Sequence, residues 1–331
     1  MTFASNAASD RLPQLSGRPF LTDGGIETQL IYLEGLELPL FAAFHLLRDA
    51  KAAAVVERVL GDYARVARDH GVGCILESVT WRASRDWGSK LGYNREDLAH
   101  ANYQAIDMLR RIRGDVATAE TPVVISGNVG PRGDGYVLGE QMSPAEAEAY
   151  HGEQVAWLDA ADVDLITAVT LNYVDEAIGF ANAVRRTRRP CVVSFTVETD
   201  GRLPGGETIG EAIMAVDEAS AGYPAYYMIN CAHPSHFAAE LENGGTWRER
   251  IRGIRANASC KSHAELDASE TLDAGDRGEL AGWFRRLRDA LPHLNVLGGC
   301  CGTDPSHIAA IASACYERDL AGADARRAAL V

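Results

Sequence analysis

The sequence contains no uninterrupted apolar run approaching the ~18 residues that a membrane-spanning helix needs. Its first eighteen residues lack the basic start and apolar centre of a signal peptide. Positive charge is scarce, because 32 Lys and Arg residues stand against 46 Asp and Glu residues, a formal net charge of −14. These absences argue against a membrane protein and against a nucleic-acid partner, whose phosphates would be repelled.

The seven cysteines include no C-x-x-C pair of the kind usual in closed structural zinc sites. An odd number of cysteines scattered through 331 residues indicates a reducing compartment with free thiols. We therefore expect a soluble, cytoplasmic protein. Residues 1–18 are predicted to form a flexible tail, and residues 19–331 a single domain that is compatible with a monomer or a homo-oligomer.

Short apolar runs alternate with helical patterns along the whole chain, and a hydrophobic fraction of 47% is enough for a large core. The apolar runs lie near residues 19–24, 73–80, 122–129, 164–171, 191–197, 225–231, 252–258 and 295–299, and the helical patterns include 51–70, 143–160 and 210–221. Eight such units without a linker predict the α/β class and a single (β/α)8 TIM-type barrel. A doubly wound open sheet is the alternative, but no G-x-G-x-x-G follows the first run.

Polar or sulfur-containing residues stand at or just past the end of each predicted strand. They are Asp23, Glu77, Asn128, Thr170, Glu198, Cys231, Asn257 and Cys300. In a (β/α)8 barrel the carboxyl ends of the strands meet at one rim, which carries the active site. The pattern therefore favours an enzyme over a structural barrel.

Three cysteines at these strand ends indicate a metal site. Cys300 and Cys301 follow two glycines at the end of the last run, and Cys231 ends the sixth. Three thiolates without a fourth protein ligand in the pattern suggest zinc with one open coordination position.

Other interpretations of these cysteines remain open. The adjacent pair could be small buried hydrophobes, a vicinal disulfide or part of a closed structural site. His233 or His236 could supply a fourth ligand and close the site. Of the remaining thiols, Cys260 is expected to be exposed, and packing roles are expected for Cys74, Cys191 and Cys315.

Several motifs carry a resemblance to a known family. They are Asp23-Gly24-Gly25-Ile26-Glu27-Thr28, Thr80-Trp81-Arg82-Ala83-Ser84, Ser126-Gly127-Asn128-Val129-Gly130-Pro131, Ser194-Phe195-Thr196 with Asp200-Gly201-Arg202-Leu203, Ile229-Asn230-Cys231, and Gly298-Gly299-Cys300-Cys301-Gly302-Thr303. With these motifs in this order, the chain resembles the homocysteine S-methyltransferase family of zinc-dependent thiol methyltransferases over residues 19–320.

The resemblance implies that Cys231, Cys300 and Cys301 ligate Zn²⁺ and that a thiol substrate takes the open position. It also implies methyl transfer from a small onium donor, such as S-methylmethionine, S-adenosylmethionine, betaine or a related sulfonium, to homocysteine or another small thiol in methionine metabolism. Coordination deprotonates the thiol, so no catalytic side chain is needed beyond the metal-activated sulfur.

Substrate contacts are expected from the residues of these motifs that follow the strands. They are Asp23, Glu27, Glu77, Thr80, Trp81, Arg82, Asn128, Thr170 and Asn230. Trp81 and Trp87 could form a cation-attracting wall for the donor.

One departure from the family pattern concerns the acceptor. Val169 stands where the family usually has a glutamate that helps to hold the amino group of homocysteine, and Arg82 offers a fork suited to a carboxylate. We therefore expect a small thiol whose carboxylate, where it has one, pairs with Arg82, and whose amino group is absent or held differently. Alternatively, Arg82 pairs with Glu77 or Asp86, and Val169 merely packs.

Two other functions are compatible with the same residues. A zinc hydrolase would hold water at the open position, although three thiolates would weaken the Lewis acidity of the metal. A non-catalytic barrel that binds zinc or a thiol would serve as a sensor or a partner module.

Overall fold

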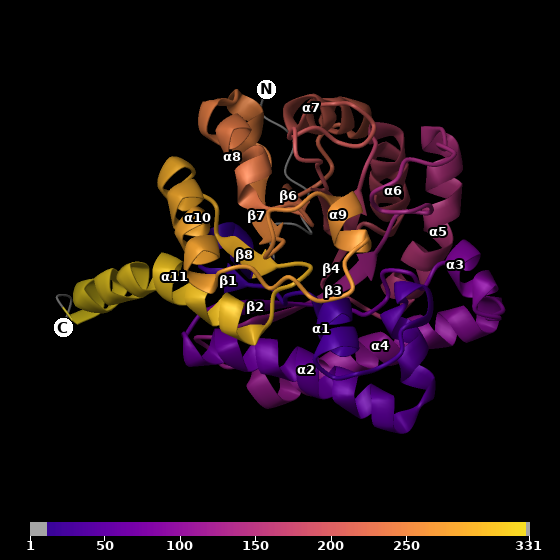
Figure 1. Ribbon diagram of the computed structural model, residues 1–331, viewed down its shortest axis with the longest axis horizontal. Helices are drawn as coiled ribbons and strands as arrows, with labels where there is room; N and C mark the ends of the chain where they lie inside the picture. Colours follow the sequence, from indigo (N-terminus) through magenta and orange to yellow (C-terminus); the bar gives the residue numbers. More distant parts are fainter. Residues whose placement is uncertain (1–11, 329–331) are drawn as a thin grey trace.

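The computed structural model describes residues 12–328, with side chains described as far as Glu317. Eight parallel strands close into a barrel in chain order, and helices surround it (Figure 1). The strands are β1 (Phe20–Leu21), β2 (Gly73–Glu77), β3 (Val123–Val129), β4 (Leu165–Leu171), β5 (Cys191–Phe195), β6 (Tyr226–Asn230), β7 (Ile251–Ala256) and β8 (Val296–Gly299). Because β1 pairs with both β2 and β8, the predicted (β/α)8 barrel is confirmed and the open-sheet alternative is wrong.

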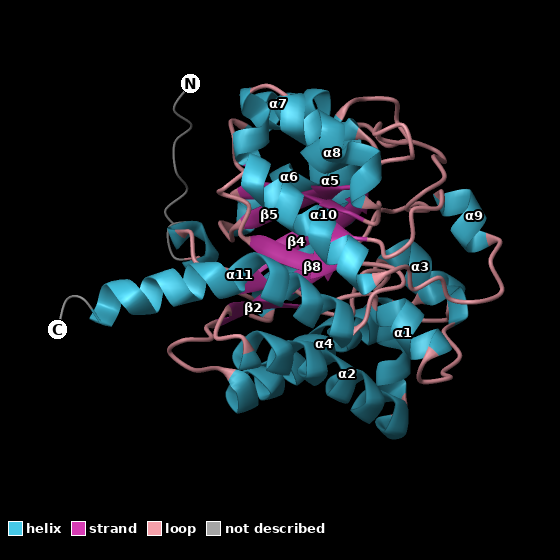
Figure 2. Ribbon diagram, turned by 60° about the vertical axis from the view of Figure 1, so that its left-hand side comes forward, coloured by secondary structure: helices cyan, strands magenta, loops and turns pink. Residues whose placement is uncertain are grey.

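The helices follow the strands and pack on the outside of the barrel (Figure 2). They are α1 (Ile26–Tyr32), α2 (Ala50–Asp69), α3 (Arg85–Lys90), α4 (Arg95–Val116), α5 (Pro144–Ala160), α6 (Val174–Thr187), α7 (Ile209–Ser220), α8 (Pro234–Asn243), α9 (His263–Asp267), α10 (Arg277–Ala290) and α11 (Pro305–Ala328). Local sequence sets several of their starts. Ser143 and Glu146, for example, form a capping box at the start of α5, satisfying N–H groups that the first turn leaves unpaired.

Two apolar layers hold the barrel together. The strand residues alternate between an inner cluster, which includes Phe20, Val192 and Tyr226, and an outer cluster that packs against the helices. Since the inner cluster draws on the early residues of the strands, it fills the end of the barrel opposite the rim with the polar residues. The loops at the rim, together with α1 and α9, lie on the right of Figure 2.

The beginning of the described chain differs from the prediction. Residues 12–18 were expected to belong to a flexible tail, but Pro13–Ser16 forms a turn of 3₁₀ helix. Leu12 joins the inner cluster, and buried Gln14 donates to the hydroxyl of Tyr226. Leu12 is held in place because its apolar side chain is buried against the inner cluster at the end of the barrel. The prediction of a flexible tail is therefore wrong for residues 12–16. Residues 1–11 lie outside the described residues.

Among the described residues, none of the helices combines the length and the apolar character required to cross a membrane.

A partly buried ion pair between Asp217 and Arg250 fastens α7 to the barrel. The carboxylate of Asp217 accepts hydrogen bonds from Arg250 (Nε, 2.7 Å; Nη2, 2.9 Å) and from the hydroxyl of Tyr227 on β6 (2.7 Å). Removing one partner of a buried pair leaves the other charge uncompensated.

We expect Asp217→Asn to lower the free energy of unfolding by about 2 kcal/mol, because the partly buried guanidinium of Arg250 then loses the carboxylate that neutralises its charge. Urea denaturation of both proteins measures this loss. The control is Glu218→Gln, at the exposed neighbouring position on α7, which should unfold at the wild-type midpoint. Equal midpoints for Asp217→Asn and wild type would contradict the argument.

Candidate metal centre and substrate pockets

Three cysteines from two loops meet at the carboxyl rim of the barrel. Cys231 follows β6, and Cys300 and Cys301 follow β8. Strand β7 lies between these strands and accepts a hydrogen bond from each loop, from Cys231 N to Arg255 O (3.0 Å) and from Cys300 N to Ala256 O (2.8 Å). The strand register therefore brings together residues that are 69 positions apart in the chain.

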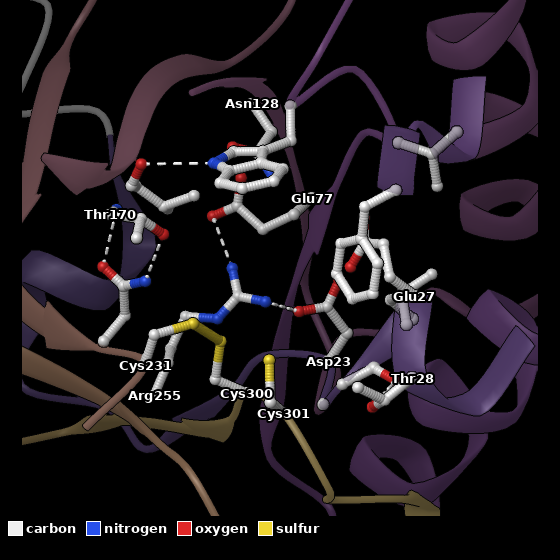
Figure 3. A pocket seen from close by; sticks show the side chains of 18 of the residues that line it. Asp23, Glu27, Thr28, Glu77, Asn128, Thr170, Cys231, Arg255, Cys300 and Cys301 are labelled. Carbon is white, nitrogen blue, oxygen red and sulfur yellow. Dashed lines mark hydrogen bonds and ion pairs between the residues drawn. A yellow bond between two sulfur atoms is a disulfide. The ribbon is translucent and has the colours of Figure 1, made fainter. Parts of the chain in front are cut away.

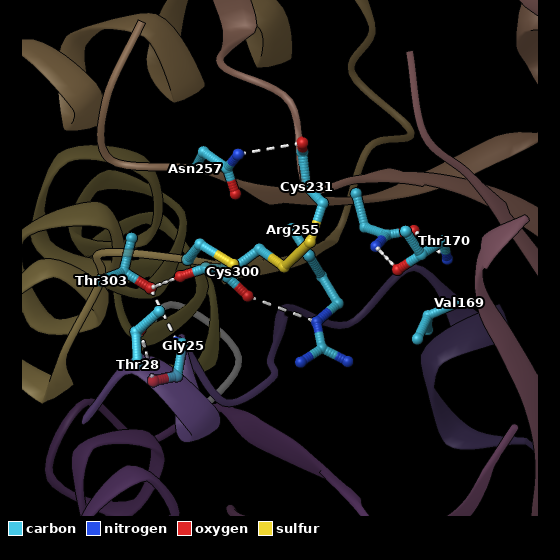
Figure 4. The surroundings of a disulfide bond; sticks show 12 residues. Gly25, Thr28, Val169, Thr170, Cys231, Arg255, Asn257, Cys300 and Thr303 are labelled. Atoms are coloured by element: carbon cyan, nitrogen blue, oxygen red, sulfur yellow. Dashed lines mark hydrogen bonds between the residues drawn. A yellow bond between two sulfur atoms is a disulfide. The ribbon is translucent and has the colours of Figure 1, made fainter. Parts of the chain in front are cut away.

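The sulfur atoms of these three residues lie within 4.8 Å of one another. Zn–S bonds of ~2.3 Å in a tetrahedral site place sulfurs about 3.8 Å apart, so one ion can be reached by all three. In this structure the sulfurs of Cys231 and Cys300 are joined as a disulfide (Figure 4). Cys301 is a free thiol. The expectation that the thiols are kept free of disulfides is therefore wrong for Cys231 and Cys300, which lie close enough either to share a metal or to pair on oxidation. The disulfide is not the vicinal one considered from the sequence.

The local sequence explains why the loops take this shape. A Cβ added at Gly298 would collide with Thr22, and one at Gly299 would collide with Thr303. Gly302 has a φ of +81°, in the left-handed region that glycine tolerates, and Cys231 itself has a φ of 53°. The glycines around the cysteine pair are thus required by close packing and by a left-handed turn.

Neighbouring side chains fix the carbonyl groups of the cysteine loops. Asn257 Nδ2 donates to Cys231 O (2.9 Å), and Thr303 Oγ1 donates to Cys300 O (2.8 Å) (Figure 4). His263 on α9 donates through Nε2 to Cys231 O (2.5 Å), while its Nδ1 lies 2.9 Å from the carboxylate of Glu198. The sequence interpretation did not single out His263, because nothing in its neighbourhood marks a contact with residue 231.

The two histidines considered as a fourth ligand have other roles. His233 Nδ1 accepts hydrogen bonds from Ser235 and caps α8. His236 Nε2 lies 2.9 Å from the carbonyl oxygen of Cys260. Neither belongs to the sulfur cluster, and the closed site with a histidine ligand therefore has no support. The other expectations for thiols are confirmed, since Cys260 is exposed and the remaining three are buried.

An inner pocket of about 50 Å³ lies against the sulfurs (Figure 3). Seven of the nine residues expected to contact substrate line it, together with the three cysteines. The seven are Asp23, Glu27, Glu77, Trp81, Asn128, Thr170 and Asn230. The structure thus brings residues from five strand ends and α1 to one place.

Two of these seven residues also hold each other in position. Asn230 Oδ1 accepts from Thr170 N (2.9 Å), and Asn230 Nδ2 donates to Thr170 Oγ1 (2.8 Å). Thr170 has a φ of 63°, a strained conformation for a β-branched residue. The Asn230 amide compensates for this strain and so shapes the pocket wall.

The two expected contacts outside the inner pocket have different positions. Thr80 is fully buried and donates from Oγ1 to Asn128 O (2.6 Å), which joins the loop after β2 to β3. Arg82 lies in a second, outer pocket, where its guanidinium forms an ion pair with Asp134 (3.7 Å) and stacks over Trp87 (3.9 Å). Pairing of Arg82 with Glu77 or Asp86 is therefore wrong.

The outer pocket, of about 380 Å³, adjoins the inner one. Cys301, Trp81 and Tyr136 line both pockets. The Tyr136 hydroxyl lies 4.0 Å from Cys301 Sγ. The carboxylates of Asp134 and Asp267 face the outer pocket. The expected Trp81–Trp87 wall is only partly formed, because Trp87 lines neither pocket and its ring carries the Arg82 guanidinium.

A buried arginine that the sequence interpretation missed, Arg255, lines the inner pocket. Arg255 donates to the carboxylate of Asp23, and its Nη1 lies 3.8 Å from Glu77 Oε1 (Figure 3). Its Nε donates to Gly299 O (3.4 Å), directly before the cysteine pair. The sequence offered little signal for this role, because β7 carries two arginines, Arg252 and Arg255, and nothing in the pattern tells them apart.

Burial perturbs the ionisation of the groups around this pocket. Burial raises the pKa of Asp23 to about 6, although attraction by Arg255 opposes the rise. Burial also raises the pKa of Glu77 and of Glu27 to about 7, and that of the Cys301 thiol to about 11. Such clusters of shifted groups in a pocket are typical of functional sites.

The fold and the site together define a class of protein, a (β/α)8 barrel with a three-cysteine candidate metal centre at its carboxyl rim. The model of the family described as homocysteine S-methyltransferase matches residues 20–315, and the chain belongs to this family.

Individual relatives agree with this membership. The chain is 24% identical over 323 residues to homocysteine S-methyltransferase 4 of Zea mays, with 90% of each chain covered. It is 26% identical over 319 residues to the methionine synthase of Mycobacterium tuberculosis, where the match covers 92% of this chain and 25% of that protein. The chain therefore spans a quarter or less of the mycobacterial methionine synthases it matches.

Solved structures share the fold. The metallated form of the homocysteine methyltransferase MmuM from Escherichia coli superposes with a TM-score of 0.72 at 20% identity, covering 92% of this chain and 97% of that one. An oxidised form of the same enzyme gives a TM-score of 0.71 at 21% identity, covering 89% and 95%.

The raised pKa of Glu77 makes the stability of the folded protein depend on pH. The folded protein holds the proton of Glu77 more tightly than the unfolded chain, whose Glu pKa is near 4.5. The folded state is therefore stabilised at low pH, and this contribution is lost as the pH rises through about 7.

Because glutamine cannot ionise, Glu77→Gln should remove this loss. Between about pH 5 and 8, the wild type should lose about 1–3 kcal/mol of unfolding free energy relative to the variant. Chemical denaturation of the reduced proteins across this range measures the difference. Glu96→Gln, at an exposed position of α4, should follow the wild type. Parallel curves for wild type and Glu77→Gln would refute the assignment.

Proposed function

We propose that this protein is a zinc-dependent S-methyltransferase that moves a methyl group from a small onium donor to a metal-bound thiol, homocysteine or a close analogue. The observation that carries the proposal is the cluster of three cysteine sulfurs within 4.8 Å, placed where two pockets meet. In this proposal Cys231, Cys300 and Cys301 hold the ion. A purely thiolate donor set suits zinc, and its three members leave one coordination position for a substrate.

Bound zinc would deprotonate the acceptor thiol and keep it as a nucleophilic thiolate at neutral pH. The chain's own thiols must first be free, so the Cys231–Cys300 disulfide has to be reduced by two electrons from a thiol or phosphine reductant. Tyr136, whose hydroxyl approaches Cys301, and His263, which binds the carbonyl of Cys231, then hold the cysteine loops in place.

The two pockets suit two substrates. The acceptor fits the inner pocket beside the sulfurs, and the larger outer pocket suits the donor. Asp134, Asp267 and the Trp81 ring would attract the positive charge of a sulfonium or quaternary ammonium group.

The reaction balances without another reactant. The acceptor thiolate forms a bond to the methyl carbon while the bond from that carbon to the donor sulfur or nitrogen breaks. The donor atom takes the electron pair and leaves as a neutral thioether or amine. The acceptor proton is lost when the thiol binds, so the remaining task of the protein is to align sulfur and methyl group.

The two alternatives receive less support. Three thiolates lower the Lewis acidity that a zinc hydrolase needs. A non-catalytic zinc-binding barrel would not require two adjoining pockets that share Cys301 in their walls.

Replacing a candidate ligand tests the metal site. The reduced protein should bind about one zinc ion per chain, and Cys301→Ser should lose the ion together with more than about 100-fold of methyl-transfer activity, since even supporting residues around metals are worth 10–100-fold. Metal analysis and transfer assays measure both effects. Cys260→Ser, at an exposed cysteine outside both pockets, is the matched control and should keep zinc and activity. Full zinc retention in Cys301→Ser would show that this thiol is not a ligand.

Replacing an acidic residue tests the donor pocket. Asp267→Asn should raise the KM for a cationic donor about fivefold with little change in kcat, because it removes one attracting charge at the rim of the pocket. Initial rates with S-methylmethionine, S-adenosylmethionine and glycine betaine as donors give the comparison. Glu270→Gln, three residues beyond Asp267 and outside the pocket lining, should leave the KM unchanged. An unchanged KM in Asp267→Asn for every active donor would place the donor elsewhere.

A further inference from the structure

The turn at Leu40 and Phe41, between α1 and α2, has an unusual backbone. The two residues have φ values of 54° and 57°, so two consecutive residues with side chains lie in the left-handed region. Every other non-glycine residue with a positive φ in the described part of the chain stands alone. Such conformations are strained, persist only where surrounding contacts hold them, and cluster at functional sites.

The strained turn brings an aromatic ring to the site. Phe41 lines both the inner and the outer pocket, whereas the side chain of Leu40 is 42% exposed. Directly after the ring, Ala42 is buried in an apolar cluster with Ala83 and Trp157. The chain thus passes from solvent to the core within two residues, and Phe41 reaches the pockets between them.

Arg82, from the loop after β2, contacts this turn. Its Nη1 donates to Leu40 O, and its Nη2 lies 3.7 Å from the carboxylate of Asp134. The guanidinium lies 3.9 Å from the centre of the Trp87 ring, and the whole side chain is only 11% exposed. Since both terminal nitrogens face protein oxygens, the end of the fork is not free to take a substrate carboxylate.

Asp134 extends this contact to a second loop at the rim. Its Oδ1 accepts from the N–H groups of Tyr136 (2.8 Å) and Val137 (3.0 Å), which fixes the turn that presents the Tyr136 ring. Tyr136 lines both pockets, as Phe41 does. One guanidinium therefore joins two loops whose aromatic rings form walls of both pockets.

The charge of Arg82 does not by itself suit the pocket that contains it. The outer pocket, which Arg82 lines, is proposed to bind a cationic donor. Like charges in one pocket repel each other, so the guanidinium as an isolated charge would weaken donor binding, and Asp134 offsets only part of this. The contacts that Arg82 makes within the protein give a reason for its presence that its charge does not.

We propose that Arg82 is a positioning residue whose guanidinium ties the strained turn to Asp134. In this role it holds Phe41 and Tyr136 as aromatic walls of the donor pocket. The inference rests on the proposed function, because it concerns the donor of that reaction. It assigns Arg82 to the protein's own loops, in place of the carboxylate of a substrate.

Donor kinetics distinguish this role from direct binding. Arg82→Met keeps an unbranched stem over Trp87 but removes the guanidinium, and it should raise the KM at least about tenfold for donors with and without a carboxylate alike. The donors are glycine betaine, S-methylmethionine and the trimethylsulfonium ion, and one that is not turned over is scored by its inhibition constant. The kcat, the KM of the thiol and the zinc content should stay within about threefold of the wild type.

The alternatives predict different results. If Arg82 binds a carboxylate of the donor, only glycine betaine and S-methylmethionine lose affinity. If Arg82 acts as a bare charge, its removal lowers the KM for all three cations. Either result overturns the proposal, as does an unchanged KM.

Two further variants complete the series. Arg82→Lys should raise the KM by an intermediate amount, because an ammonium group lacks the fork that reaches both oxygens. It gives the same comparison of donors if Arg82→Met does not fold. Arg85→Met removes a 59% exposed charge outside both pockets and should keep the wild-type KM for every donor.

Hydrogen exchange tests the contact without catalysis. The amides of Phe41 and Ala42 donate within the turn to Leu38 O (2.9 Å) and Pro39 O (3.1 Å). In Arg82→Met these two amides should exchange at least about tenfold faster than in the wild type, while the amides of α7 keep their rates. Equal exchange of the two amides in both proteins would show that Arg82 does not hold the turn.

Failure of this inference can be told apart from failure of the proposed function. Faster exchange in Arg82→Met, with no methyl transfer by the wild type from these donors or from S-adenosylmethionine, keeps the role of Arg82 in the turn and refutes the methyltransferase. Methyl transfer by the wild type, with equal exchange and equal KM values in Arg82→Met, keeps the methyltransferase and refutes the positioning role.

Discussion

The pairing of β7 with its two neighbours is the constraint on which the site depends. One side of the strand accepts the backbone N–H of Cys231, and the other accepts that of Cys300. The sheet sets where the two loops begin, and the loops then converge over the end of β7, since the Cα atoms of Cys231 and Cys300 lie 5.3 Å apart, less than two inter-strand spacings of about 4.8 Å each. The same strand carries Arg255 into the pocket, so β7 links the candidate metal centre to the polar wall beside it.

This arrangement places different chemistry at different depths. Apolar side chains fill the lower barrel, charged groups surround the inner pocket, and the sulfurs stand where the inner pocket meets the outer one. Burial keeps the inner carboxyl groups partly protonated near neutral pH, with pKa values of about 6 for Asp23 and about 7 for Glu77. The positive charge of Arg255 therefore faces less negative charge than a count of carboxyl groups suggests.

The sequence was sufficient for the fold because its signals are local. Each strand coincides with a short, mostly apolar run. Each observed strand lies inside its predicted run or begins within about one residue of it, as β3 (Val123–Val129) lies inside 122–129. The clustering of the cysteines was also accessible, since strand ends in a barrel share one rim. The pairing of Arg255 with Asp23 was not, because the two residues are 232 positions apart and meet only across the closed barrel. The position of Arg82 depended on loop packing against Trp87, which leaves no periodic signal. The burial of Leu12 was missed because residues that are small and polar on average surround it.

Leu12 and its neighbours close one end of the barrel, and this limits how substrates enter and products leave. In the proposed reaction both substrates have to enter at the same rim. The wall between the inner and the outer pocket includes Trp81, Tyr136 and Cys301, so the inner pocket is reached through the outer one. The deeper ligand must then arrive first and depart last. Kinetically, this corresponds to a compulsory order of addition, with the demethylated donor released before the methylated thiol.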